Sequence, residues 1–313
     1  MNLSWLDDFL ALASTGNFSR AAEDRHMTQP AFGRRVRALE EWLGTELFDR
    51  RSQPVRLTAT GEWFHRVAHD LLAQVARVPG EARTVAEANS NRLRFAATHA
   101  LSFTFMPGWL RSLEAHTMGG TIQLESDMLQ RCEALIEQGK VQFVVCHVHP
   151  QAPGRLHAEA YPSVQIGGDV LIPVSAAGPD GRPLHLLESG VPPVSLLTYS
   201  AESGLGRILQ ETRSAALEKI ARQTPFTAHL ASVLRTMALD GRGMAWLPKS
   251  LIAEDLAAHR LVPAASHAWD VDLEIRLYRD RAPMGRAAEA LWEVVRQTGY
   301  SMLGEVAANA SPR

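Results

Sequence analysis

Four residues at helical spacing near the start of this sequence are of types suited to reading a polar surface. Gln29, Gly33, Arg34 and Arg37 fall on one face of a predicted helix, opposite its apolar residues. In the major groove of DNA a glutamine amide can bind adenine, and an arginine can bind guanine or a phosphate. The competing interpretation is an ordinary amphipathic helix whose arginines form a solvated face.

Two helices joined by a tight turn would hold this face. The first follows Asn17 or Ser19, whose short polar side chains can cap a helix N-terminus. The second begins at Thr28, has Pro30 in its first turn and ends at Gly44. The apolar stripe of the first helix is Phe18, Ala21 and Ala22, and that of the second is Ala31, Val36, Leu39, Trp42 and Leu43.

An arginine-rich turn follows the second helix. The sequence ELFDRRSQPVRLTATG contains a short apolar segment, a turn around Ser52-Gln53-Pro54 and a second apolar segment. We interpret it as a β-wing with Arg50, Arg51 and Arg56 at its tip. Thr58 is placed to cap the helix that comes next.

These segments together resemble a known family. The ordered set A-x-x-x-x-x-T-Q-P-A-F-x-R-R-V-R-x-L-E, L-F-x-R and R-L-T-x-x-G is similar to the winged helix-turn-helix of LysR-type transcriptional regulators, over residues 3–66 without a gap. The resemblance implies a regulator that binds double-stranded DNA. Gly33 stands where the family usually has a small hydroxyl residue, which removes one contact to phosphate or base. The DNA-contacting residues that the resemblance implies are Ser19, Arg20, Thr28, Gln29, Pro30, Phe32, Gly33, Arg34, Arg35, Arg37, Arg50, Arg51, Arg56 and Thr58.

Composition excludes several classes of protein. The chain has 313 residues, of which 46% are hydrophobic and 21% charged, as in ordinary globular proteins of two or three domains. No run of about 18 apolar residues predicts a membrane span, and the first residues lack the basic start of a signal peptide. Two cysteines do not make a disulfide framework, so we expect a cytoplasmic protein. The net charge is −2, so the basic character lies in local clusters at residues 34–37 and 50–56.

A long helical pattern over residues 58–89 follows the wing. Its apolar residues recur near heptad spacing, and a lone helix of this length needs a partner. The family resemblance implies an antiparallel linker-helix homodimer. Pro79-Gly80 interrupts the pattern, so we expect a bend or a restart at Glu81. The apolar positions are Phe64, Val67, Leu71, Val75 and Val78.

From Arg92 the sequence alternates between strands and helices, which is typical of an α/β fold. The family resemblance implies a periplasmic-binding-protein-like effector domain with two subdomains, between which the chain crosses twice. The predicted strands are 92–98, 121–126, 141–148, near 156–162, 165–174, 194–197, 226–229, 244–247 and 271–279. The predicted helices are 102–115, 128–138, 204–221, 230–240, 249–257 and 284–298.

A ligand of such a fold binds at the carboxyl ends of strands, against helix N-termini. Hydroxyl and imidazole side chains follow several predicted strands, and they make candidate contacts to an anionic effector. Serine at a helix start can equally be a cap with no ligand. The candidate effector-binding residues are Thr98, His99, Ser102, Ser126, His147, His149, Thr198, Tyr199 and Ser200.

Metal, redox and enzyme interpretations have weaker support. His147 and His149 share one face of a strand while Cys146 points away, so a zinc site would lack its third and fourth ligands. Cys146 has no adjacent lysine or arginine to favour its thiolate. The sequence contains no G-x-S-x-G, H-E-x-x-H or phosphate-binding loop, so we expect no cofactor, no metal and no enzyme activity.

A narrower resemblance concerns the hypochlorite-responsive LysR regulators. It rests on His99-Ala-Leu-Ser, Tyr199-Ser, Gly206-Arg207 and the run from Ala238 to Pro248, and it implies a link to methionine oxidation. Leu205 stands where the resemblance places a methionine. The candidate methionines are Met106, Met128, Met237 and Met244.

The interpretation is a regulator of transcription, dimeric through the linker and tetrameric through the effector domains, controlled by a small anion or an oxidant. The alternative is a solute-binding or enzymatic α/β protein whose N-terminal helices only mediate assembly. The predicted domains are 1–58 for the winged helix-turn-helix, 59–90 for the linker and 91–303 for the effector domain. Within the last, subdomain I is 92–161 with 268–301, and subdomain II is 162–267.

Overall fold

The computed structural model describes residues 2–52, 54–86, 92–113, 121–156, 158–187, 193–220 and 222–298. Contacts divide the chain into two units, Met1–Pro79 and Gly80–Arg313. Several predicted features lie outside the described residues: Gln53 of the wing turn, residues 87–90 of the linker, residues 114–115 of a helix, and everything beyond residue 298.

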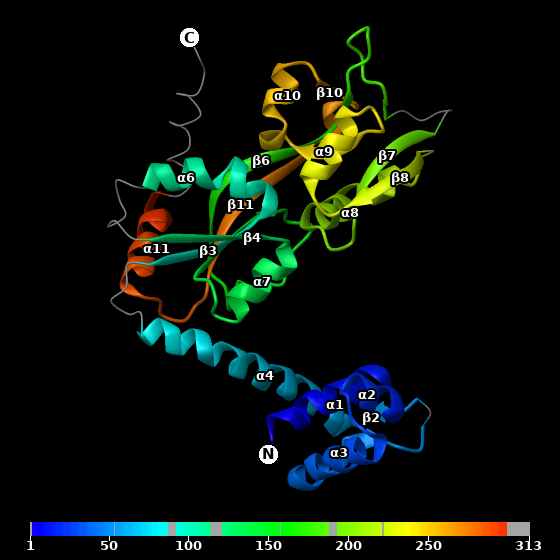
Figure 1. Cartoon of the computed structure of the whole chain (residues 1–313), viewed down its shortest axis with the longest axis vertical. Helices are drawn as coiled ribbons and strands as arrows, with labels where there is room; N and C mark the ends of the chain where they lie inside the picture. Colours follow the sequence, from blue (N-terminus) through cyan, green and yellow to red (C-terminus); the bar gives the residue numbers. More distant parts are fainter. Residues whose placement is uncertain are drawn as a thin grey trace. The chain divides into compact units, whose positions relative to one another are not determined.

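The first unit is a bundle of short helices with a two-stranded wing (Figure 1). Asn17 caps the second helix, because its Oδ1 accepts hydrogen bonds from the backbone N–H groups of Ser19 and Arg20. Gly44 takes the left-handed conformation that ends the third helix, as predicted. The elements are α1 (Leu3–Thr15), α2 (Phe18–Asp24), α3 (Gln29–Leu43), β1 (Phe48–Asp49), β2 (Arg56–Leu57) and the start of α4 (Ala59–Ala86).

Aromatic residues from several elements fill the core of this unit. Phe9 lies in the middle, with its ring centroid 5.2 Å from that of Phe48 and 5.1 Å from that of Phe64. Phe32 of α3 is also fully buried and contacts the ring of Phe18. The predicted apolar face of α3 was wrong in one position, because Trp42 is 55% exposed and Phe32 occupies the core instead.

Helix α4 is continuous from Ala59 to Ala86 and contains Pro79. Of the bend or restart expected at Glu81, the restart was therefore wrong. A proline inside a helix removes one hydrogen bond, here to the carbonyl of Val75, but the turns on either side keep theirs. Several apolar side chains of α4 are exposed, including Trp63, Val75, Val78 and Val85.

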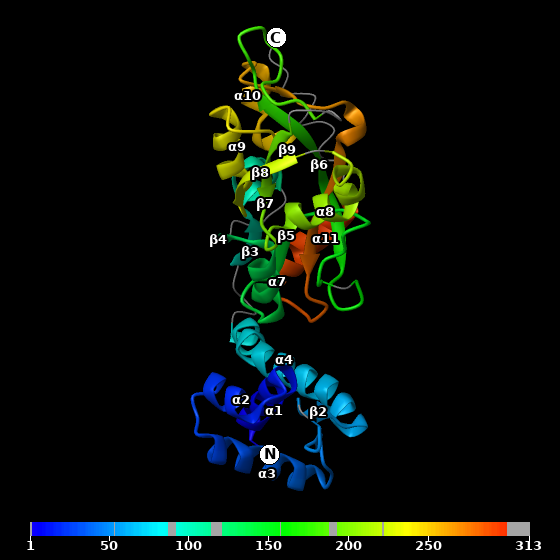
Figure 2. The same cartoon turned by 90° about the vertical axis from the view of Figure 1, so that its right-hand side faces the viewer.

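The second unit is built on a seven-stranded sheet with the order β10-β6-β11-β5-β3-β4, in which β9 also pairs with β6. Two views of it are given in Figures 1 and 2. Its first elements are β3 (Leu93–Thr98), α5 (His99–Thr104), α6 (Met106–Leu113), β4 (Ile122–Asp127), α7 (Leu129–Glu137), β5 (Phe143–Val148) and β6 (Ser163–Ala176). Strands β3, β4 and β5 are parallel, while β11 runs antiparallel to β5 and β6.

The remaining elements build the other subdomain and return to the sheet. They are β7 (Val194–Tyr199), α8 (Gly204–Leu217), β8 (Arg222–Ala228), α9 (Ala231–Leu239), β9 (Ala245–Pro248), η1 (Lys249–Leu251), α10 (Ala253–Ala257), β10 (Leu261–Pro263), η2 (His267–Trp269), β11 (Val271–Arg279) and α11 (Arg286–Thr298). Strands β7 and β8 form a separate parallel pair.

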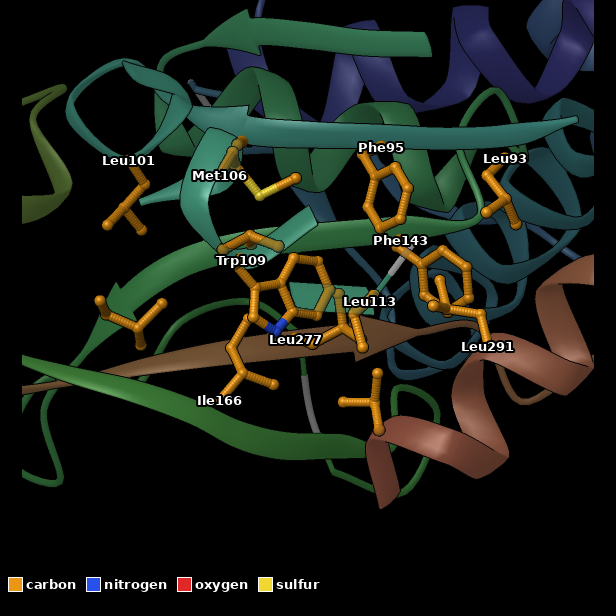
Figure 3. Packing of buried hydrophobic residues seen from close by; sticks show 14 of the residues in the cluster. Leu93, Phe95, Leu101, Met106, Trp109, Leu113, Phe143, Ile166, Leu277 and Leu291 are labelled. Carbon is orange, nitrogen blue, oxygen red and sulfur yellow. The ribbon is translucent and has the colours of Figure 1, made fainter. Parts of the chain in front are cut away.

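Alternation along the strands sends side chains to two helical layers. Phe95 and Phe143 pack on one face with Trp109 of α6 and Leu291 of α11, as Figure 3 shows. Ala96, the residue after Phe95 on β3, faces the other side of the sheet, where α7 packs. A sheet buried on both faces explains why most residues of β3 and β5 are apolar and buried without alternation.

Several predicted boundaries differ from the structure. The helix expected at 102–115 is two helices, because Pro107 fits the first turn of a new helix and ends α5 before it. The strand expected near 156–162 is absent from the described residues of that range, and β6 is one strand of 14 residues. Helix 204–221 ends at Leu217, helix 249–257 is divided at Ile252, and β10 was not predicted.

The start of α4 provides a stability test of this packing. A Cβ added at Gly61 would lie 2.1 Å from the backbone oxygen of Leu47, so Gly61→Ala should destabilise the first unit by about 1–3 kcal/mol. Gly33, also in a helix, has no atom within 4 Å of an added Cβ among the described residues. Gly33→Ala is the matched control and should stabilise by about 0.5–1 kcal/mol. Urea unfolding of both variants measures the difference, and equal stabilities would contradict the close approach.

Candidate DNA-binding surface and ligand pocket

The exposed side of α3 carries most of the residues predicted to read a surface. Gln29, Arg34 and Arg37 are exposed and line one open hollow together with Gly33 and Arg50. The Oγ of Ser19 on α2 donates to Oε1 of Gln29 at 3.2 Å, which holds the glutamine amide in place. Thr28 is exposed at the N-terminus of α3, followed by Pro30 in its first turn. Arg20, on α2, is exposed as well.

Two of the predicted contact residues have structural roles instead. Phe32 is fully buried, so its side chain cannot reach DNA. The guanidinium of Arg35 binds the carboxylate of Asp8, with Nε 2.8 Å from Oδ2. Asp8 is itself fully buried and binds Arg25 through Oδ1 at 2.9 Å. This charge cluster ties α1 to the C-terminal end of α2 and to the middle of α3. A single acidic residue in the first helix does not indicate such a cluster in the sequence.

The wing combines exposed arginines with one that is anchored. Arg51 and Arg56 are exposed, whereas Arg50 forms an ion pair with Glu40 of α3. The Glu40 carboxylate also accepts hydrogen bonds from the backbone N–H groups of Leu47 and Phe48, so it fixes the start of the wing. Thr58 caps α4 as predicted, because its Oγ1 accepts from the N–H of Gly61 at 3.0 Å.

The second unit contains a pocket of about 50 Å³ where the two subdomains meet. A cavity of this size holds a few waters or a small anion. Each of four loops that line it follows a parallel strand and leads into a helix, which is where ligands bind in open α/β sheets. The lining residues are Thr98, His99, Ala100, Asp127, Met128, Leu129, His147, Glu202, Ser203, Gly204, Leu205, His229, Leu230 and Ala231.

Helix N-termini point their free backbone N–H groups at this pocket. Helices α7, α8 and α9, of 9 to 14 residues, begin there, and the short α5 begins there too. Ser203 caps α8, but Thr98, Met128 and Leu230 make no side-chain cap bond to described residues. Uncapped N-termini leave donors and positive dipole ends for an anion.

Polar side chains of the pocket add to this arrangement. The Oγ1 atom of Thr98 is buried and has no hydrogen-bond partner among the described residues. Nδ1 of His99 lies 3.0 Å from the hydroxyl of Ser126 on the neighbouring strand. His147 is buried, and its Nε2 lies 3.3 Å from Oδ2 of Asp169. A buried hydroxyl without a partner is a donor that a ligand can use.

The structure brings three of the candidate effector-binding residues, Thr98, His99 and His147, together at this pocket, and it places the others elsewhere. Ser102 donates back to the carbonyls of Ala97 and Thr98, so it belongs to the helix rather than to the pocket. Ser126 acts only through His99. Thr198 Oγ1 lies 2.9 Å from Thr227 Oγ1, and the lining does not include Ser200. His149 lines a different groove, beside Lys249 and Ser250.

The hydroxyl of Tyr199 bonds within the protein and does not face the pocket. The phenol donates to the carbonyl of Trp246 at 2.8 Å, and burial raises the pKa of Tyr199 above its usual value. The lining also includes residues that were not among the effector candidates, such as Met128, His229 and Leu230. The rule that found Thr98 applies to them too, since each follows the end of a parallel strand.

The cysteines and histidines do not assemble a reactive centre. Cys132 and Cys146 are buried and free, and burial raises the pKa of both thiols, that of Cys132 to about 12. His147 and His149 line different hollows, and no group of three or more His, Cys, Asp or Glu residues is placed to hold a metal in the described part of the chain. Among the helices described, none combines the length and apolar character that a membrane crossing requires.

Comparison with known proteins shows the family of both parts of the chain. Residues 3–62 match the bacterial regulatory helix-turn-helix protein, lysR family, and residues 86–299 match the LysR substrate binding domain. The chain belongs to the LysR family of DNA-binding transcriptional regulators. It is not an enzyme. The match excludes the alternative of a solute-binding or enzymatic protein whose N-terminal helices only mediate assembly.

Individual LysR relatives cover nearly the whole chain. The transcriptional regulator YjiE of Escherichia coli is 30% identical over 293 residues, which are 94% of this chain and 93% of that protein. The structure of Vibrio fischeri DarR in complex with DNA is 29% identical, with a TM-score of 0.55, covering 94% of this chain and 98% of that one. Full-length HypT of Salmonella typhimurium, described as a hypochlorite-specific LysR-type regulator, is 28% identical, with a TM-score of 0.57 and coverages of 96% and 99%. The two-subdomain α/β fold with an N-terminal winged helix-turn-helix is confirmed.

Tyr199 provides a test of which strand-end hydroxyls are structural. Tyr199→Phe removes the hydrogen bond to Trp246 and leaves a carbonyl unpaired, so we expect a loss of about 0.5–1.5 kcal/mol in the free energy of unfolding. Urea denaturation measures this loss. An unchanged stability would show that the phenol is free for a ligand, as the sequence had indicated.

Proposed function

We propose that α3 is the recognition helix of this LysR regulator and that its N-terminal half enters the major groove. Gln29, Arg34 and Arg37 would contact base edges or phosphates. Arg51 and Arg56 on the wing would contact the phosphate backbone, with Arg50 braced by Glu40 beside them. The exposure of these side chains on one face, while Phe32 and Arg35 hold the fold, supports this assignment. Ser19, Arg20, Thr28, Pro30, Gly33 and Thr58 complete the proposed interface.

We propose further that the pocket of the second unit binds a small anionic effector or an oxidant. The single observation that carries this proposal is the meeting of helix N-termini around the unpaired hydroxyl of Thr98. Each N-terminus favours an anion by about 0.3–1 kcal/mol. A ligand that touches both subdomains can hold them together, and that differential contact is what allosteric control requires.

We propose in addition that the protein forms homodimers and tetramers and that it belongs to the hypochlorite-responsive regulators. Exposed apolar residues of α4 support a homodimer formed by residues 59–90, and the effector domains (residues 91–303) would join dimers into a tetramer. The domain bounds remain those predicted from the sequence, with the protein acting in the cytoplasm. Similarity to HypT supports a hypochlorite-responsive regulator, and of the four candidate methionines Met128 lines the pocket, beside Leu205.

Gln29 tests the reading of bases. Gln29→Ala should cost about 1–3 kcal/mol of discrimination at one base pair of the operator, because an amide pairs with one base edge. Binding to operators with each position changed, from the promoter beside the gene, measures the preference. Equal loss of affinity for specific and random DNA would make Gln29 a phosphate contact instead.

Arg51 and Arg56 test the wing. Because each phosphate contact releases a counterion, Arg51→Ala and Arg56→Ala should each flatten the slope of log affinity against log salt by about one unit. The control is Arg296→Ala, which removes an exposed arginine paired with Glu293 in the second unit. A double variant with the slope of the unchanged protein would remove the wing from the interface.

Thr98 tests the effector pocket. Thr98→Val keeps the shape of the side chain but removes the hydroxyl, so affinity for bromide or nitrate should fall by about 3- to 10-fold. The rise in melting temperature with anion concentration measures affinity, at an ionic strength held constant with sodium gluconate, whose anion is too bulky for the cavity. Ser102→Ala, whose hydroxyl bonds to its own helix, is the matched control and should keep the response. The opposite pattern in the two variants would move the site.

A further inference from the structure

His147 stands between the proposed anion pocket and a buried carboxylate. Its Nε2 lies 3.3 Å from Oδ2 of Asp169, and the two side chains are 4% and 3% exposed. The residue itself lines the pocket, while Asp169 lines the separate groove beside Lys249 and Ser250. With Nε2 directed at Asp169, Nδ1 is the ring nitrogen that remains for an anion.

The Asp169 carboxylate is held by several donors, which keep it in the ionised form. The hydroxyl of Ser250 donates to Oδ2 at 2.6 Å, and the backbone N–H of Ser250 donates to Oδ1 at 3.1 Å. Burial by itself raises the pKa of Asp169, but the hydrogen bonds from His147 and Ser250 prevail and hold that pKa below its usual value. An ionised carboxylate requires a donor opposite it, so Nε2 of His147 carries a proton.

The proton on Nε2 determines whether Nδ1 of His147 can donate a hydrogen bond. A neutral imidazole has one N–H, and here that N–H serves Asp169, which leaves Nδ1 as an acceptor. An acceptor repels an anion. Nδ1 can donate to an anion only when the ring is doubly protonated and positively charged.

We propose that Asp169 is a positioning residue of the anion pocket, which allows His147 to become an imidazolium donor, so that anion binding takes up a proton at His147. This proposal rests on the proposed anion site. It adds that affinity for the effector depends on pH and that one buried carboxylate sets this dependence.

Other charged groups near the pocket oppose an anion, so a second proton on His147 matters more for anion binding. Asp127 and Glu202 line the pocket and oppose an anion, while His99 and His229 are the other imidazoles of its lining. On its opposite side His147 borders a small cavity of about 10 Å³, lined also by Glu133, Cys146, Arg207 and Tyr278. His99 has Ser126 as its partner and His229 is exposed, so neither is held against a carboxylate as His147 is against Asp169.

Calorimetric titration of the full-length protein with sodium bromide tests the proposal. Titrations at pH 6, 7 and 8, in two zwitterionic buffers with different heats of ionisation, give both the affinity and the number of protons taken up. We expect proton uptake on binding and a loss of affinity of up to about tenfold per pH unit as the pH rises.

Four variants separate the possible sources of this dependence. Asp169→Asn and His147→Gln should each weaken bromide binding at pH 6 by about tenfold and flatten its pH dependence. His99→Gln and His229→Gln should keep the pH dependence, because their rings lack the buried carboxylate. Asp272→Asn, a carboxylate of the neighbouring groove outside this network, is the control for a general change of charge and should change nothing.

Each remaining outcome counts against the proposal. An unchanged pH dependence in His147→Gln would overturn it while leaving the anion site intact, even if Asp169→Asn fails to fold. Loss of the pH dependence in His99→Gln or His229→Gln alone would assign the proton elsewhere. No binding of bromide or nitrate by the unchanged protein at any pH would overturn the proposed anion site, and this inference with it.

Discussion

The antiparallel pairing of β6 with β11 is the constraint on which the ligand-binding part of the chain depends. Strand β6 is long enough to pair with β11 along most of its length and with β9 and β10 near its end. One continuous ladder therefore joins the sheet of the first subdomain to the strands of the second. The N-termini of helices from both subdomains line one pocket in this part of the chain.

In each unit, a buried carboxylate joins neighbouring helices through ion pairs with two arginines. In the first unit, Asp8 binds Arg25 and Arg35 and so joins three helices. In the second, the fully buried Asp255 binds Arg235 and Arg260 and ties α10 to α9. A buried carboxylate is costly unless paired, so removal of its arginine partners would leave an uncompensated buried charge in each cluster.

The proposed DNA-binding surface and the proposed anion pocket differ in how far their polar groups are held in place before a ligand binds. On α3 the polar residues are exposed, and the order there comes from neighbours such as Ser19 against Gln29 and Glu40 against Arg50. In the proposed anion pocket the donors would be backbone N–H groups fixed by the helices, so a ligand would require little ordering there. The small cavity volume restricts the ligand more than any single side chain does.

The sequence by itself determined the N-terminal domain, because its signals are local. A cap at Asn17, a proline in the first turn of α3 and a left-handed Gly44 each depend on neighbouring residues, and all were predicted. The class of the second unit followed in the same way from its alternating strands and helices. The rule that parallel strands end at a common edge indicated where the loops of the pocket would gather.

Tertiary structure alone decided which side chains are available at each site. Phe32 and Trp42 both lie on α3, and only packing against Phe18 and the neighbouring helices buries the first and exposes the second. Ser102 and Tyr199 follow strands as Thr98 does, yet their hydroxyls bond to their own helix and to Trp246. The partnership of His147 with Asp169 joins residues 22 positions apart through strand pairing, and a local pattern contains no record of it.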